Sequence, residues 1–214
     1  MKTTILAAAR QIKPSPIGQA SFNTAGTFEW TCPPGVTRIC LAMMGAGGSS
    51  THNGNANVNS RWVGDGGNLR YQNDIDVVPG QKYTIVVPTP QQKTSKPATA
   101  FGISTADPIS GNLKGADGSK YPTATPAVLL GCNAGGAVAG NNGYGFNLLT
   151  FTQVTANAPG WSTTNRVGCI PGGGAGVYNG GSSFPYFGAA GAIGAVRIIW
   201  GSGRAFPNKN IGNL

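Results

Sequence analysis

The chain has 214 residues, of which 35 are glycine, and charged residues make up only 10%. Glycine is thus more than twice as frequent as the usual ~7% and charge is far below the usual ~25%, with no collagen-like period of three. These proportions exclude a triple helix and favour one domain with long loops and a surface of Asn, Ser, Thr and Gly, which suits extracellular or virion proteins. Nowhere do about 18 apolar residues run together, so a transmembrane helix is excluded.

The formal net charge of +9 is spread over the whole chain. The 15 basic residues run from Lys2 to Lys209 without forming a basic stripe. Specific nucleic-acid binding is therefore not expected, whereas attraction to an anionic cell envelope needs no such stripe.

Residues 1–20 are expected to form an arm ahead of the domain. They carry Lys2, Arg10 and Lys13 but no acid, and Pro14-Ser15-Pro16 stiffens their end. The short apolar run is too weak for a signal peptide. A disordered leader and an arm that docks onto another protein or a sister subunit are both open. The docking candidates are Ile5, Leu6, Arg10 and Ile12.

From Phe22 the apolar residues alternate, which predicts β-strands. Thr27–Cys32 and Val36–Met44 read as two strands joined at Pro33-Pro34-Gly35, and we predict that they form a hairpin. A loop is expected from Gly45 to Gly67.

A second hairpin is predicted downstream. Leu69–Gln72 and Ile75–Val78 resume the extended pattern, Pro79-Gly80 is a strong turn signal, and Lys82–Val87 reads as the returning strand.

Residues 88–126 are proline-rich and predicted to form a long loop. Short strands are expected at Ala127–Leu130 and Leu148–Thr152, and the last strand, Gly194–Trp200, is apolar enough on both faces to be central. The pattern predicts an all-β fold: a β-sandwich of short antiparallel strands with long glycine-rich loops, covering residues 21–207, followed by a tail at residues 208–214.

The four cysteines do not form close CxxC pairs, so a zinc site is not expected. Cys32 and Cys40 could face each other across the first predicted hairpin. Buried free thiols are the preferred interpretation for these two residues and for Cys132 and Cys169.

Candidate catalytic residues are few. His52, the single histidine, lies in an Asn-rich loop without a nucleophile motif. Asp74 and Asp76 could form a carboxylate pair, but an ordinary solvated edge is the favoured interpretation. Asp117-Gly118 lacks the acidic ladder of a calcium loop, and Gly172–Gly176 lacks the Lys-Ser/Thr of a phosphate loop. No enzymatic activity, metal or cofactor is expected.

Aromatic residues set among glycines are the candidates for recognition, because rigid rings supply contact area and glycine allows close backbone approach. The alternative is that half of them plug their loops onto the core. The receptor-contact candidates are Trp62, Tyr144, Trp161, Tyr178, Phe184, Tyr186 and Phe187.

Three groups of motifs stand out in the sequence. They are Gly26-Thr-Phe-x-Trp30-Thr-Cys-Pro-x-Gly35 with Gly45-Ala-Gly-Gly48, then Tyr71-x-Asn73-Asp-Ile75-x-Val77-x-Pro79-Gly80-Gln81-x-Tyr83, then Gly194-Ala-Val-Arg-Ile-Ile-Trp-Gly-x-Gly-Arg204-x-Phe206-Pro207. Together they resemble the glycine-rich domain at the tips of bacteriophage tail fibres. The resemblance covers roughly residues 22–87 and 188–207, a little under half of the chain.

The resemblance implies a structural virion protein of a tailed phage, assembled in the host cytoplasm and placed at a tail-fibre or baseplate tip that attaches to the host. Expected partners are other tail or baseplate proteins and a host surface glycan or outer-membrane protein. A homotrimer is one assembly open to it, since trimers are common among phage fibres, and membrane insertion is not expected. The alternative is a connector that packs only against virion proteins, and a remote one is an envelope depolymerase.

Overall fold

The computed structural model describes residues 16–50, 64–92, 96–105, 112–113, 145–154, 172, 190–207 and 209–214. These ranges contain strands and turns but no helix, and so no helix that could cross a membrane. The all-β prediction is confirmed. The described strands are β1 (Gly18–Phe22), β2 (Gly26–Thr31), β3 (Arg38–Met44), β4 (Gly48–Ser49), β5 (Leu69–Asp76), β6 (Lys82–Val87), β7 (Gln91–Gln92), β8 (Thr99–Ala100), β9 (Ile103–Ser104), β10 (Asn112–Leu113), β11 (Gly145–Asn147), β12 (Thr152–Val154) and β13 (Ala195–Trp200).

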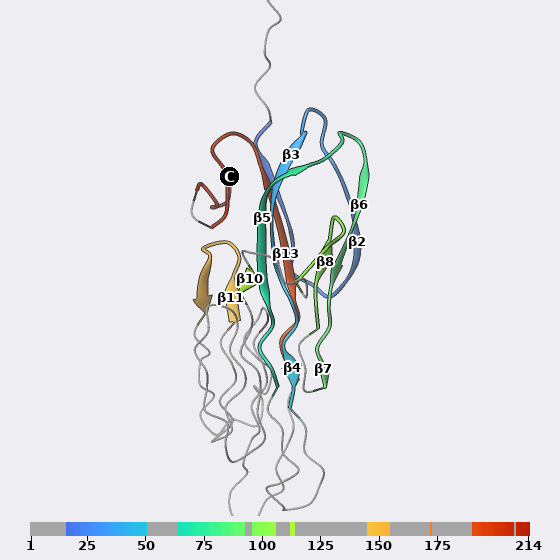
Figure 1. The fold of residues 1–214 in the computed structure, drawn as a ribbon, viewed down its shortest axis with the longest axis vertical. Coiled ribbons are helices and arrows are strands. Elements are labelled where there is room, and N and C mark those ends of the chain that lie inside the picture. Colours follow the sequence, from blue (N-terminus) through green and yellow to red (C-terminus); the bar gives the residue numbers. More distant parts are fainter. Residues whose placement is uncertain are drawn as a thin grey trace, which may run out of the picture.

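The strands form two larger sheets that face each other. One has five strands in the order β1-β13-β3-β5-β10, and the other has four in the order β2-β6-β8-β9. Neighbouring strands in both sheets are antiparallel. Figure 1 shows the layers nearly edge-on, with β5 and β13 in one and β2 and β6 in the other. The short pairs β4–β7 and β11–β12 lie outside these two sheets.

One long antiparallel ribbon, bent in the middle, supplies strands to both sheets. Its arms are residues 26–44 and 69–87, so that β2 pairs with β6 in one sheet and β3 pairs with β5 in the other. Backbone hydrogen bonds continue through the bend, for example from the Val77 N–H to the Thr37 carbonyl at 3.0 Å. Both predicted hairpins are therefore wrong, because each predicted turn carries the chain from one sheet to the other.

The two bends are turns of the same kind. Each has proline followed by glycine in the left-handed region, with φ of 79° at Gly35 and 80° at Gly80. In each, the N–H of the fourth residue donates to the carbonyl of the first, at 3.2 and 3.1 Å. This sequence suits a type II turn, which splays the flanking strands instead of closing a two-residue hairpin. We call residues 33–37 and 77–81 the corner end.

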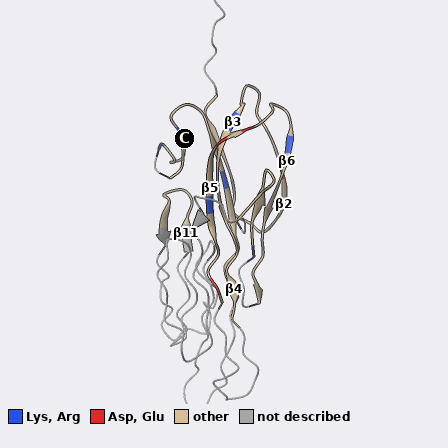
Figure 2. Ribbon diagram, viewed as in Figure 1, with Lys and Arg blue, Asp and Glu red and all other residues tan. Residues whose placement is uncertain are grey.

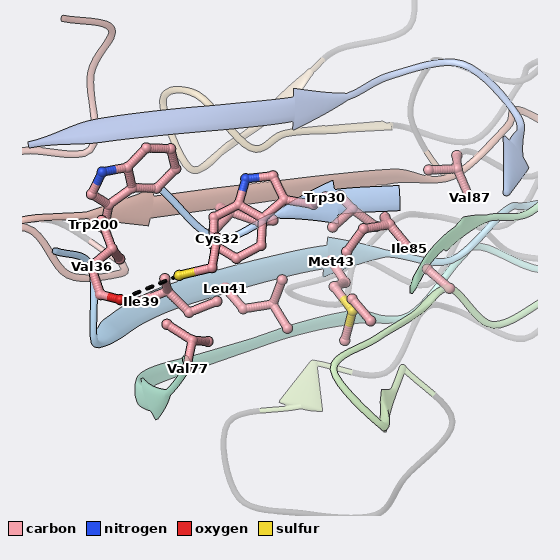
Figure 3. Packing of buried hydrophobic residues seen from close by; sticks show 14 residues of the cluster. Trp30, Cys32, Val36, Ile39, Leu41, Met43, Val77, Ile85, Val87 and Trp200 are labelled. Carbon is pink, nitrogen blue, oxygen red and sulfur yellow. Dashed lines mark hydrogen bonds between the residues drawn. The ribbon is translucent and has the colours of Figure 1, made fainter. Parts of the chain in front are cut away.

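One apolar cluster fills the space between the two sheets. Trp30 and Ile85 reach it from the four-stranded sheet, and Leu41, Ile198 and Trp200 reach it from the five-stranded sheet. The rings of Trp30 and Trp200 lie 5.7 Å apart, which links the layers directly. Figure 3 shows Trp30, Leu41, Ile85 and Trp200 converging between the strands.

The five-stranded sheet is covered on its other face as well. Ala42, Met44 and Ile199 point away from the first cluster and pack with Leu148 and Phe206 in a second one. All six residues of β13 are consequently buried, and β13 lies between β1 and β3. The prediction of a central last strand is confirmed.

Several predicted boundaries differ from the structure. The five-stranded sheet begins at Gly18, inside the predicted arm, where β1 pairs with β13. The predicted tail folds back, since Ala205 and Lys209 exchange two backbone hydrogen bonds of 2.9 Å and Ile211 packs on the second cluster. The predicted loop at residues 88–126 contains four short strands, β7 to β10.

The predicted strand Leu148–Thr152 is mostly a turn between β11 and β12. The Asn147 side-chain oxygen accepts a hydrogen bond from the Leu149 N–H at 2.7 Å, and Phe151 has a φ of 56°. A side chain that bonds its own backbone two residues on favours a turn over an extended chain. The predicted strand at residues 127–130 lies outside the described residues.

Candidate functional site

Four backbone segments close into a ring at one end of the sheets. They are residues 45–49, 64–68, 172 and 190–194, and we call them the glycine ring. Each segment is hydrogen-bonded to the next, and the last is bonded to the first. In each bond a backbone N–H donates to a carbonyl of the next segment. The donor and acceptor residues are Gly45 and Asn68 (2.9 Å), Gly67 and Gly172 (2.7 Å), Gly172 and Ile193 (2.9 Å), and Gly47 and Ala192 (2.9 Å).

The ring closes because glycine lets the backbones lie closer than any side chain would allow. A Cβ atom on Gly67 would overlap the carbonyl group of Gly45 and lie 3.2 Å from the Cα of Gly172. One on Gly191 would overlap the carbonyl group of Gly47. The obstacles are backbone atoms, which cannot turn aside as the end of a flexible side chain can. Glycine at these positions is therefore a packing requirement.

A further segment braces the ring from the side. The Gly194 N–H donates to the Pro88 carbonyl at 3.1 Å, and Ala46 and Lys96 exchange hydrogen bonds of 2.8 and 3.1 Å. Short β4 runs parallel to β7 at the same place. The ring is thus tied to both sheets, since residues 88–96 follow β6.

Three long stretches of sequence adjoin the ring. Residues 51–63 join two of its segments, residues 173–189 join the other two, and residues 155–171 end at Gly172. All predicted receptor-contact residues lie outside the described residues. Trp62, Trp161, Tyr178, Phe184, Tyr186 and Phe187 belong to these three stretches, and Tyr144 directly precedes β11.

The corner end lies at the opposite end of the sheets. β3 runs from Arg38 at the corner to Met44 at the ring, seven residues or about 20 Å. The described chain begins at the corner end, because Gly18 pairs with Trp200 there and the ring of Pro16 lies beside Gly35. In Figure 1, β4 and β7 at the ring are at the bottom, and the bends are at the top.

The corner end carries exposed apolar side chains. Ile17 is 55% exposed and Val78 58%, and Pro16, Pro34 and Pro79 are also exposed. The predicted docking residues Ile5, Leu6, Arg10 and Ile12 precede this end in the sequence and lie outside the described residues.

Three arginines are buried and serve the fold, namely Arg70, Arg197 and Arg204. The guanidinium of Arg197 donates to the Leu148 carbonyl at 2.9 Å and to the Gln19 side chain at 3.1 Å. Burial lowers the pKa of Arg197, and the neighbouring charge of Arg204 lowers it further. Figure 2 shows the described Lys and Arg positions scattered along the ribbon.

Arg204 joins the two ends of the described chain. It donates to the carbonyls of Gly18 (2.7 Å), Asn210 (2.8 Å) and Gly212, and to the side chain of Gln19. Gln19 in turn donates to the side chain of Asn213 at 2.8 Å. We call these contacts the terminal clamp. The clamp was not predicted from the sequence, in which Arg204 stands only as one position of the resembling motif Gly194–Pro207.

The carboxylate pair is exposed, as the favoured interpretation expected. Asp74 lies in a bulge where Cys40 faces two residues of β5, and its φ of 57° is left-handed. Asp76 accepts a hydrogen bond from Arg38 Nε at 3.2 Å, and both side chains of this ion pair are largely in solvent. Both carboxylates thus lie at the solvent-exposed surface of β5.

Cys32 and Cys40 are buried free thiols, as expected. They lie on opposite faces of the five-stranded sheet, in different apolar clusters, and do not face each other. Cys32 Sγ donates to the Val36 carbonyl at 3.2 Å (Figure 3) and Cys40 Sγ to the Arg204 carbonyl at 3.4 Å. Burial raises the pKa of both thiols.

The remaining candidate chemistry lies mostly outside the described residues. His52, Asp117, Cys132, Cys169 and residues 173–176 are all in this class. Within the described ranges, no group of three or more His, Cys, Asp or Glu side chains is placed to hold a metal ion.

No protein-family model matches the chain, and no curated protein matches it significantly.

Proposed function

We propose that this chain is a structural virion protein of a tailed bacteriophage, located at a tail-fibre or baseplate tip, and that it attaches the particle to the host surface. The observation that carries the proposal is the polarity of the molecule. The described part of the chain begins at the corner end, and the stretches that hold nearly all aromatic candidates adjoin the glycine ring about 20 Å away. Docking and recognition can therefore use opposite ends.

The residues that carry the phage resemblance support the assignment of docking and recognition to opposite ends. Trp30 and Trp200 pack the core, Gly35 forms a bend, Gly45 belongs to the ring, and Arg204 holds the terminal clamp. The resembling segments thus make up the frame. The stretches between them are long, rich in glycine and aromatic residues, and suited to contact with a glycan or an outer-membrane protein.

Nothing in the described part of the chain favours the depolymerase alternative. Its one carboxylate pair is exposed, and Asp76 is engaged by Arg38. The pair also lies on the corner half of β5, away from the ring.

A binding assay tests the proposal. Labelled full-length chain should bind phage-susceptible cells but not resistant cells. Added in excess, it should also slow the adsorption of phage to susceptible cells. Trp161→Ala, in a stretch that adjoins the ring, should weaken both effects, while Lys209→Ala, an exposed change near the C-terminal turn, should leave them intact. Equal, negligible binding to both cell types would contradict host attachment, and incorporation into particles without such binding would identify a connector.

A further inference from the structure

Each of the two sheets ends, on one side, in a strand with no second neighbour among the described residues. These strands are β1 in the five-stranded sheet and β2 in the four-stranded sheet. They lie on the same side of the molecule, because only residues 23–25 separate them and the rings of Phe22 and Phe28 are 5.4 Å apart. Among the described residues, one side of the molecule therefore presents two free edges, one above the other.

Apart from Gly18, whose carbonyl accepts a hydrogen bond from Arg204, these edges lack the usual protection. Residues 18–31 contain no Lys, Arg or Pro and a single acid, Glu29, and neither β1 nor β2 has a bulge in its pairing. Exposed edges in soluble proteins are normally shortened, charged, bulged or covered, since they otherwise pair with other strands.

The opposite side of the molecule is protected in those ways. Its described edge strands, β9 and β10, have two residues each. The part of β5 that extends beyond β10 contains the bulge and the exposed Asp74 and Asp76. The contrast indicates that only the β1–β2 side is built to receive a partner.

The gap between the two free edges is lined by apolar side chains. Ala20, Phe22 and Phe28 pack against the core but remain partly exposed. A partner that covers the edges would also complete the burial of these side chains.

We infer that the partner is a second copy of this chain, related by a twofold axis parallel to the strands. Such a rotation exchanges the two layers, so that β1 meets β2 of the partner subunit and β2 meets β1 of the partner subunit. β1 runs from the corner end to the ring and β2 runs back, so both new pairs are antiparallel. Each sheet then continues into the other copy, and all four free edges are used.

The alternation of the strands agrees with this pairing. Residues directly opposite in an antiparallel pair face the same side, and Ala20 and Phe22 face the core, as do Phe28 and Trp30. Gly18 pairs with Trp200, whose ring packs against that of Trp30, so the two strands share the same height along the axis. This height places the exposed Ser21 opposite Thr27 or Glu29 of the partner subunit.

Charge and symmetry favour this pair over other assemblies. β1 has no charged residue, so Glu29 meets no like charge across either new pair. A ring would need a complementary edge on the far side, where the described edges are two residues long. In a trimer, each of the two free edges would have to pair with a different neighbouring subunit, although the edges are only about 10 Å apart. The twofold pair also keeps both glycine rings at one end.

Disulfide trapping in the full-length chain tests the pairing. Ser21→Cys with Thr27→Cys, or Ser21→Cys with Glu29→Cys, places cysteines directly opposite each other between copies, within the reach of a disulfide. Within one copy these positions lie on the outer faces of different sheets, which pack about 10 Å apart. Ser21→Cys with Thr84→Cys is the matched control, since Thr84 is exposed but lies one strand further in, on β6.

The expected result is a covalent dimer from one of the first two variants after mild oxidation, and none from the control or the parent chain. Light scattering of the parent chain should give twice its mass of 21.7 kDa. A monomer in solution, no cross-link in either variant, or equal cross-linking in the control would overturn the inference. Host-cell binding by a monomer would do so while leaving the proposed function intact.

Discussion

Glycine and proline have different roles at the two ends of this molecule. At the corner end, proline and glycine turn two strands from one sheet to the other, and apolar side chains remain exposed around the bends. At the ring, glycine brings four backbones together and leaves no space for side chains. Glycine is thus conformational at one end and steric at the other, and the ends should tolerate substitution very differently.

The largest effect is expected at the ring, from Gly67→Ala. The added methyl group would overlap the carbonyl group of Gly45, and only backbone could move to relieve it. Overpacking of this kind costs 1–3 kcal/mol and occasionally more, and we expect at least about 3 kcal/mol in the free energy of unfolding, measured by urea denaturation. Gly212→Ala, with no atom near its Cβ position, is the control and should change stability by less than about 0.5 kcal/mol.

The second-largest loss in the free energy of unfolding is expected at the terminal clamp, from Arg204→Met. This change keeps the apolar stem but leaves the carbonyls of Gly18, Asn210 and Gly212 without their donor. Losing hydrogen bonds from a charged, buried group is worth about 2–3 kcal/mol. The same denaturation assay checks it, with the exposed Lys209→Met as control, and equal stability of the two variants would show that the clamp is not structural.

A smaller loss is expected at the corner end, from Gly80→Ala. No atom lies near the Cβ position, so only the left-handed φ of 80° resists the change. That conformation costs an alanine about 1–2 kcal/mol. Thermal unfolding should therefore rank Gly80→Ala clearly above Gly67→Ala in stability, and the reverse order would contradict the distinction between the two ends.

Because two thiols are buried, we expect the protein to lose some stability at alkaline pH. Burial raises the pKa of Cys32 and Cys40 above 9.0 in the folded state, whereas in the unfolded chain both titrate near that value. The stability from keeping them protonated is fully present below about pH 9.0 and is lost as pH rises through the folded pKa values. Denaturation midpoints should therefore fall above pH 9.0, and less steeply in Cys40→Ala. Identical alkaline slopes in parent and variant would exclude the Cys40 contribution.

The positions of the strands could largely be predicted from the sequence, but the pairing between strands could not. Alternation in residues 27–32 and 82–87 predicted two strands correctly, because side-chain period depends only on local geometry. The hairpin prediction failed because proline before glycine was read as a generic turn. The type II geometry that this pair favours splays strands, so Pro79-Gly80 already contained a signal against a tight hairpin.

The glycine ring could not be predicted in the same way. Gly45, Gly67, Gly172 and Gly191 are far apart in sequence, and each alone is compatible with a flexible loop. Their role depends on contacts between backbones that come together only once β3, β5 and β13 are paired. Arg197 and Arg204 were likewise hidden, because their partners are mostly backbone carbonyls, which every sequence offers.

The orientation of the protein in the intact virion tests the central claim most directly. A cryo-EM map of the tail into which this structure is fitted should place the corner end, marked by Pro34 and Pro79, against the particle and the glycine ring toward the exterior. A map with the ring end buried among other virion proteins and the corner end free would contradict host attachment through the stretches that adjoin the ring.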